Sequence, residues 1–178
     1  MSAPYSPAAV ANEFLLRGQR ESRPITPLQL QKLTYITYGW YLGVTGEKLF
    51  DESVEAWDHG PVIPSLFHEF KKFGREPITR LAHTAKDLGF DASEPFIRED
   101  DTTATQLVDW VWKSYGGKSG GQLRKLTHMS GTPWDVTKKK VEIENNGVWI
   151  SGQVIDAELI KQHYQDLWAK WAKVHEYA

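Results

Sequence analysis

A glycine-rich segment in the second half of the chain offers the clearest match to catalytic motifs. Residues 117–121 read Gly-Lys-Ser-Gly-Gly, which contains the Gly-x-Ser-x-Gly string of a serine nucleophile and the Gly-Lys-Ser end of a phosphate-binding loop. Both motifs require a strand directly before the loop, whereas the preceding residues predict a helix. The phosphate loop also needs a glycine where this chain has Trp112. We therefore expect a connection between two helices, with Ser119 as a cap and no catalytic residue.

A metal site in this chain would need histidine or carboxylate ligands, because the chain has no cysteine. The pair His68-Glu69 begins like a zinc-protease helix, but the second histidine of that motif is replaced by Lys72. No other histidine stands at a recognised ligand spacing from a second histidine or a carboxylate. We expect neither a metal nor a cofactor.

Charge is unevenly distributed, although Lys and Arg total 21 against 23 Asp and Glu. Residues 87–109 hold seven acidic side chains against Arg98, and residues 113–140 hold seven basic side chains against Asp135. A net charge of -2 supplies no global field for polyanions, so nucleic-acid binding would need a local patch. Such runs are mostly solvated faces, and some of them mark partners.

The order helix, glycine-rich turn, basic helix over residues 103–129 resembles a helix-turn-helix. Gln122, Arg124 and Lys125 fall near the start of its second helix, where contacts to bases or phosphates would lie. DNA binding, as a transcriptional regulator of a mobile-element or phage operon, therefore stays open as an alternative function.

Composition fits one compact soluble domain spanning residues 1–178, with 40% hydrophobic and 25% charged residues. Eight Trp, seven Tyr and seven Phe supply most of the material for a core, and those left over could anchor a protein partner. The longest stretch without Asp, Glu, Lys or Arg has 14 residues, too few for a membrane span, and the start does not resemble a signal peptide. We expect a cytoplasmic protein without a membrane partner.

Capping signals divide the chain into helices. Ser6 and Thr26 each precede a proline, and Thr26 with Gln29, like Ser119 with Gln122, has capping-box spacing. Thr102 or Thr103 is the expected cap of the helix that ends at Tyr115, and Asp156 that of the last helix. The predicted helices are residues 7–18, 27–42, 63–74, 78–88, 103–115, 120–129 and the segment after Asp156.

Residues 27–42 are apolar nearly all round, which predicts a central buried helix. On it, Lys32 must either extend its stem to solvent, which we favour, or pair inside the fold. Gly39 and Gly43 would let another element approach closely.

Two short segments predict strands. Residues 53–57 favour a strand that Gly60-Pro61 breaks before the next helix, and residues 141–150 predict a hairpin turning at Asn146-Gly147. The fold class is thus mainly α: a single compact multi-helix domain around a buried central helix, with a small β-hairpin or β-ribbon.

Several blocks together carry a family resemblance. They are Val10-Ala11-Asn12 with Phe14-Leu15, then Leu30-Gln31-Lys32-Leu33 leading to Gly39-Trp40, then residues 55–62 (Glu-Ala-Trp-Asp-His-Gly-Pro-Val), Phe70-Lys71 with Gly74, and Leu126-Thr127-His128 with Pro133-Trp134. The chain resembles the Panacea domain, the SocA-like antitoxin family, also described as phage-associated or GepA-like proteins. His59 stands where that family commonly has an aromatic residue.

The resemblance implies an antitoxin of a toxin-antitoxin system, which neutralises a cognate protein toxin by direct contact and without catalysis or cofactor. Family signatures mostly hold a fold, so we expect the toxin surface to lie partly outside them. The expected contact residues are Arg124, Lys125, His128, Lys138, Lys139 and Lys140, with Trp134 as aromatic anchor, and secondly the corner of Trp57, His59 and Pro61.

Overall fold

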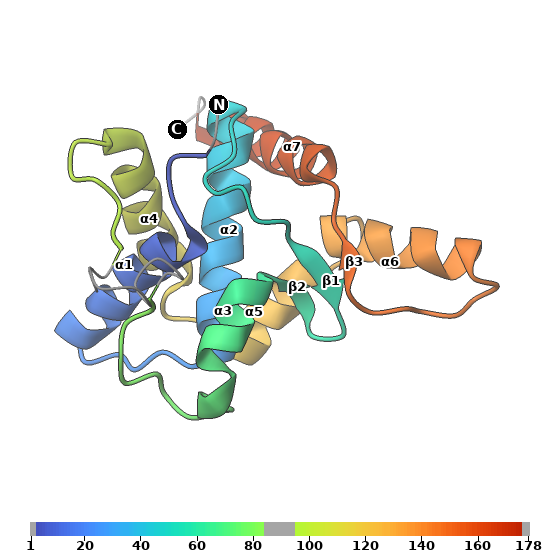
Figure 1. Cartoon of the computed structure of the whole chain (residues 1–178). Helices are drawn as coiled ribbons and strands as arrows, with labels where there is room; N and C mark the ends of the chain where they lie inside the picture. The colour runs from blue at the N-terminus through green and yellow to red at the C-terminus, as the bar shows by residue number, and fades with distance from the viewer. Residues whose placement is uncertain (1–2, 84–94, 176–178) are drawn as a thin grey trace.

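The computed structural model describes residues 3–83 and 95–175 (Figure 1). Its elements, in chain order, are α1 (Pro7–Arg20), α2 (Pro27–Thr45), β1 (Glu55–Trp57), β2 (Gly60–Val62), α3 (Pro64–Phe70) with a 3₁₀ turn η1 (Lys71–Phe73), α4 (Thr102–Tyr115), α5 (Gly120–Thr127), α6 (Pro133–Glu144), β3 (Gln153–Val154) and α7 (Ala157–His175). The mainly α fold with a small β component is confirmed.

Helix α2 is the central element, as predicted, and helices α1, α3, α4, α5 and α7 pack against it, whereas α6 contacts α7 and β1 (Figure 1). Thr26 and Gln29 form the expected capping box, and Gly46 ends the helix in the left-handed conformation at φ 76°. A continuous run of thirteen residues, from Leu30 to Leu42, is buried. A helix enclosed on all sides must be apolar all round, and this one is nearly so.

The two glycines of α2 receive α7. A Cβ atom on Gly39 would lie 2.1 Å from Cε2 of Tyr164, and one on Gly43 would lie 2.8 Å from Cβ of the same tyrosine. The prediction that these glycines admit a close neighbour is confirmed. Tyr164 also meets Tyr35 and Trp40 edge to face, with ring centroids 6.2 Å and 5.3 Å apart.

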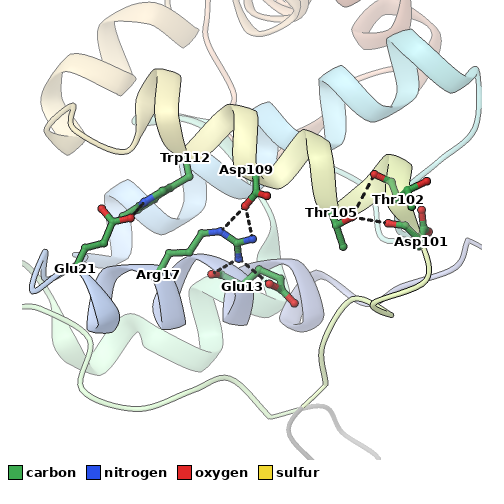
Figure 2. A network of polar contacts seen from close by, with 8 residues as sticks. All are labelled: Glu13, Arg17, Glu21, Asp101, Thr102, Thr105, Asp109 and Trp112. Atoms are coloured by element: carbon green, nitrogen blue, oxygen red, sulfur yellow. Dashed lines mark hydrogen bonds and ion pairs between the residues drawn. The ribbon is translucent and has the colours of Figure 1, made fainter.

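Helices α1 and α4 are joined by a polar network (Figure 2). The Arg17 guanidinium lies between Glu13 and Asp109, with Nη1 2.7 Å from Glu13 Oε2 and Nη2 2.6 Å from Asp109 Oδ1. One turn further along each helix, Trp112 Nε1 donates to Glu21 Oε1 at 2.9 Å. The cap of α4 is Asp101, which accepts from Ala104 N at 3.0 Å, so the prediction of a threonine cap was wrong by one or two residues.

The sheet has the order β2-β1-β3, and both pairings are antiparallel. The sequence interpretation placed Gly60-Pro61 as a break between strand and helix, but these residues begin strand β2 and pair with Trp57 and Ala56. Proline is tolerated here because β2 is an edge strand, where a missing N–H breaks no ladder.

The hairpin predicted over residues 141–150 is wrong, because residues 141–144 complete helix α6. The apolar residues Val141 and Ile143 alternate with Glu142 and Glu144, as in a half-buried strand, where both apolar side chains would share one face. In helix α6 residues two positions apart lie on nearly opposite sides, so Val141 is buried and Ile143 is 82% exposed. Thr132 caps the helix, and ion pairs four residues apart support it, among them Lys138–Glu142 at 3.6 Å. Asn146 and Gly147 do have positive φ, in the turn that follows the helix.

The helix predicted over residues 78–88 is absent from its described part, residues 78–83, and the remainder lies outside the described residues. Those six residues pass α1 without forming a helix. There the side chain of buried Asn12 forms hydrogen bonds with backbone groups that have no helical partner. Its Oδ1 accepts from Ala82 N at 2.7 Å, and its Nδ2 donates to Ala82 O and Pro95 O at 3.0 Å each. These tertiary contacts explain why the local helical pattern is not followed.

The last helix begins as predicted, with Asp156 Oδ1 accepting from Glu158 N at 2.9 Å. Of its predicted inner face, Ile160 and Tyr164 are buried, whereas Trp171 and Val174 near its far end are exposed. Trp171 stacks on Trp168 with centroids 5.1 Å apart. Among the described residues, no helix combines the length and the hydrophobicity that crossing a membrane requires.

Candidate functional site

The turn of the β1–β2 hairpin is held by the end of α5 and the start of α6. Trp134 Nε1 donates to the carbonyl of Trp57 at 2.8 Å, and the Trp134 ring lies against the His128 ring with centroids 3.9 Å apart. Arg124 Nη2 and His128 Nε2 each lie 3.4 Å from the carbonyl oxygen of Asp58. We call these five residues, Trp57, Asp58, Arg124, His128 and Trp134, the hairpin cluster.

The ring of His128 is oriented by its own helix. Its Nδ1 lies 2.7 Å from Arg124 O, a much shorter contact than that of Nε2 with Asp58 O. A neutral imidazole has one N–H, and the short contact assigns it to Nδ1. Burial lowers the pKa of His128, and the nearby Lys32 and Arg124 charges act in the same direction. Burial and these two charges thus favour the neutral ring.

Gly60 allows the hairpin to fit against this cluster. Its φ is 101°, and a Cβ atom there would lie 2.7 Å from His128 Cε1 and 3.0 Å from Lys32 Nζ. Both the backbone conformation and the space therefore require glycine.

Lys32 is fully buried beneath the hairpin, contrary to the favoured expectation that it extends to solvent. Its Nζ donates to Pro61 O at 2.8 Å. Within the described part of the chain, no carboxylate forms an ion pair with it. Burial, and to a lesser extent the Arg124 charge, lowers its pKa from 10.5 to about 7.

Gln31, which the sequence reasoning did not single out, holds the same strand from the neighbouring position. Its Nε2 donates to Ile63 O at 3.0 Å, and its Oε1 accepts from Ile63 N at 2.9 Å. Gln31 and Lys32 thus connect α2 to the end of β2 through three hydrogen bonds. The available signal was two adjacent polar residues in an otherwise apolar helix, since buried polar groups need partners.

A cavity of about 740 Å³ opens beside Lys32, between α2, the hairpin, α3 and α5. We call it the Lys32 pocket. Its apolar lining comprises Pro27, Leu28, Trp57, Val62, Leu66 and Phe67, and its basic lining comprises Lys32, Lys71, Arg75 and Arg124. His59 and Asp58 also line it, and Asp58 Oδ1 accepts from Trp149 Nε1 at 2.8 Å. The pocket is an apolar recess with an excess of positive charge.

The structure brings together most of the residues singled out from the sequence. Arg124, His128, Trp134 and Trp57 belong to the hairpin cluster, Pro61 accepts from Lys32, and exposed His59 lines the pocket. Trp134 is only 7% exposed, so its ring packs within the molecule.

The remaining lysines lie apart from this cluster on helix surfaces. Lys139 pairs with Asp135 at 2.7 Å and Lys140 with Glu144 at 4.0 Å, each within α6. Lys138 lies 5.5 Å from the Trp134 ring centroid in addition to its ion pair with Glu142. Lys125 is exposed on α5, and its side chain has no ion pair in the described ranges.

The motifs considered for other chemistry have structural roles. Ser119 caps α5 in the predicted capping box, and helix α4, not a strand, precedes it. In residues 3–83 and 95–175, no three His, Asp or Glu side chains gather in a group that could hold a metal ion.

The start of α5 is packed against α2, which bears on the DNA-binding alternative. A Cβ atom on Gly120 would lie 3.0 Å from Leu28 Cδ2, and Gln29 Nε2 donates to Lys118 O at 3.0 Å. Of the three residues considered for DNA contacts, Gln122 and Lys125 are exposed, and Arg124 reaches toward the hairpin.

Comparison with known proteins gives two matches. The family described as "Antitoxin SocA-like, Panacea domain" matches residues 30–135, which include Gln31, Lys32, the hairpin and every residue of the hairpin cluster. A relative named Antitoxin SocA, from Caulobacter vibrioides (strain NA1000 / CB15N), is 34% identical over 128 residues, covering 72% of this chain and 68% of the relative. No solved structure matches the chain. The residues that connect α2, the hairpin and α5 are thus those of the matched region, and the chain belongs to the SocA-like antitoxin family with a Panacea domain.

Proposed function

We propose that this protein is an antitoxin that neutralises a cognate protein toxin by direct contact. The observation that carries the proposal is the 34% identity to Antitoxin SocA over most of both chains. The partner is a protein and the mode of action is binding rather than catalysis.

The surface around the hairpin supports a role in binding. The turn is held by a hydrogen bond from Trp134 to the Trp57 carbonyl and by the longer contact of Arg124 with the Asp58 carbonyl, while His59 and Arg124 are exposed beside an apolar recess. Preorganised surfaces of this kind lose little conformational freedom on binding. Arg124, Lys125, His128, Trp134, Lys138, Lys139, Lys140, Trp57, His59 and Pro61 remain the residues we propose at or behind the contact surface.

The proposal is tested by co-expression with the products of adjacent open reading frames. A neighbour that is toxic alone should become harmless with this chain, and the two proteins should co-elute as a complex. If every neighbouring product stays as toxic in the presence of this chain as without it, the proposal is wrong for this protein.

Charge reversal then locates the surface. Arg124→Glu with Lys125→Glu should weaken toxin binding by roughly tenfold or more if the toxin surface is acidic, because like charges at an interface are costly. Lys113→Glu is the matched control, because Lys113 is exposed on α4 and lies outside the pocket. This variant should bind the toxin as the wild type does. A folded double variant with unchanged affinity would remove α5 from the interface and leave residues 57–62 as the next candidate.

A DNA-binding regulator remains the alternative, because Gln122 and Lys125 are exposed on α5. Tight binding to the DNA upstream of its own gene, weakening steeply with salt as counterion release requires, would favour it.

A further inference from the structure

We propose that the Lys32 pocket binds a carboxylate of the partner protein together with an adjacent apolar side chain, and that the Lys32 ammonium group is its anchor. This inference rests on the proposed function, because the partner is taken to be a protein.

The first observation is the incomplete bonding of Lys32. An ammonium group has three N–H donors. In residues 3–83 and 95–175, Pro61 O is the one hydrogen-bond acceptor within reach of Nζ, and the side chain is fully buried. A charged group buried with one neutral acceptor is poorly compensated. A carboxylate in the pocket would bring the missing opposite charge beside Lys32 and, once the buried side chain rotates toward the pocket, the missing acceptors.

The second observation is that a second cation faces the same pocket. Arg124 lines it, its Nη2 has only the long 3.4 Å contact with Asp58 O, and no described carboxylate pairs with it. The two positive charges disfavour each other, and the Arg124 charge adds to burial, the larger cause, in lowering the pKa of Lys32. An anion beside both would convert this repulsion into two attractions. Lys71 and Arg75 add positive charge at the pocket, against Asp58 alone, whose carboxylate already accepts from Trp149.

The third observation selects the kind of anion. Most of the remaining pocket wall is hydrocarbon or aromatic, from residues such as Leu28, Val62 and Phe67. A phosphate needs donors around three oxygens, whereas a carboxylate can be bound by Lys32 and Arg124 while the apolar side chain beside it packs against this wall. The cavity volume of about 740 Å³ lies within the usual range for small-molecule sites and suits one or two residues of a peptide. The occupant is therefore an acidic side chain or a chain-terminal carboxylate next to an apolar residue.

The pocket can be tested without the toxin. The probes are N-acetylphenylalanine and its uncharged counterpart N-acetylphenylalaninamide, added to the full chain while the Lys32 side-chain ¹³C resonance is followed over pH. The acid should raise the pKa of Lys32 above its value of about 7, and the amide should leave it unchanged. Lys32→Met should weaken binding of the acid by roughly tenfold.

Arg124→Met is the second variant, because exposed Arg124 can be replaced without disturbing the buried bonds of Lys32. This variant should also weaken binding of N-acetylphenylalanine, and it should raise the pKa of Lys32 in the free protein. Equal binding of acid and amide, or a Lys32 resonance that responds to neither, would overturn the proposal. A response to inorganic phosphate alone would also overturn it, in favour of a phosphate site.

Calorimetry with the toxin tests the occupant. At mildly alkaline pH the wild type should take up a proton on forming the complex, because Lys32 becomes charged, and Lys32→Met should not. Lys113→Met, exposed on α4 outside the pocket, is the matched control and should keep both affinity and proton uptake. If the toxin is neutralised but Lys32→Met binds it unchanged, the pocket proposal fails and the proposed function stands. If no toxin is neutralised, the proposed function fails. Binding of N-acetylphenylalanine and its amide then decides alone whether the pocket binds carboxylates.

Discussion

The indole nitrogen of Trp134 donates to the main-chain oxygen of Trp57 at 2.8 Å, across 77 residues of sequence. The bond joins the start of α6 to the hairpin turn. Trp134→Phe keeps an aromatic ring but leaves the Trp57 carbonyl without this donor. We expect a loss of about 1–3 kcal/mol in the free energy of unfolding, measured by urea denaturation.

Trp168→Phe is the control for that variant, because Trp168 is 47% exposed and substitutions at such sites cost about 0.5 kcal/mol or less. Equal stability of the two variants would mean that the Trp134 bond contributes nothing net.

Gly60→Ala should destabilise the hairpin more than any other alanine substitution at a turn glycine. A φ of 101° costs an alanine about 1–3 kcal/mol, and the added Cβ would meet His128 and Lys32. Gly117→Ala is the matched control, since a Cβ there has no neighbour within 4 Å and its φ is not positive. Thermal unfolding of both variants tests this prediction. A Gly60→Ala protein as stable as the Gly117→Ala control would contradict the expected destabilisation.

Lys32 predicts a particular dependence of stability on pH. Its pKa is about 7 in the folded protein and 10.5 in the unfolded chain, so the unfolded state binds more protons between these values. Stability contributed by this residue therefore rises with pH across that window, by at most about 1.4 kcal/mol per pH unit. Below pH 7 Lys32 is protonated in both the folded and the unfolded protein, so burial of its charge lowers the free energy of unfolding by the full amount.

The measurement compares the unfolding free energies of the wild type and Lys32→Met over that pH range. The difference should move in favour of the wild type as pH rises from 7 toward 10. The other titrating groups are common to both proteins and cancel. Lys125→Met should give a curve parallel to the wild type, and a parallel curve for Lys32→Met would show that Lys32 titrates normally.

Asn12→Ala should loosen the extended segment that follows η1. The substitution removes the partners of Ala82 N, Ala82 O and Pro95 O, three backbone groups at a buried site. We expect a loss of about 2–4 kcal/mol and faster amide hydrogen exchange at Ala82 than in the wild type. Asn12→Asp keeps the acceptor for Ala82 N but loses the two donors, so it should protect that amide better than alanine does.

Helix starts could be predicted from the sequence because capping is local. Thr26 with Gln29 and Ser119 with Gln122 place donor and acceptor within one turn, and both capping boxes are present. The central position of α2 followed from its uniform hydrophobicity. Val141 and Ile143 misled the prediction because four residues of alternating apolar and charged type are too short a segment to distinguish the strand period from the helix period.

The site was only partly predictable, because its contacts are tertiary. His128, Trp134 and Trp57 were singled out as types of residue found at interfaces, yet nothing local indicated that they meet at one turn. The burial of Lys32 depends on strand β2, which the sequence interpretation removed by treating Pro61 as a breaker. A cavity between four elements has no signature in any one of them.

The contacts around the hairpin also set when this region can form. Lys32 and Pro61 are 29 residues apart, Asp58 and His128 are 70 apart, and Trp57 and Trp134 are 77 apart. A chain made from its N-terminus has α2 and the hairpin long before α5 and α6 exist. Until α5 has left the ribosome the pocket lacks its Arg124 side, and until Trp134 has followed the Trp57 carbonyl lacks its donor. The pocket is therefore completed late in synthesis, and ribosome-bound fragments that end before α5 should lack the side that Gly120, Gly121 and Arg124 form.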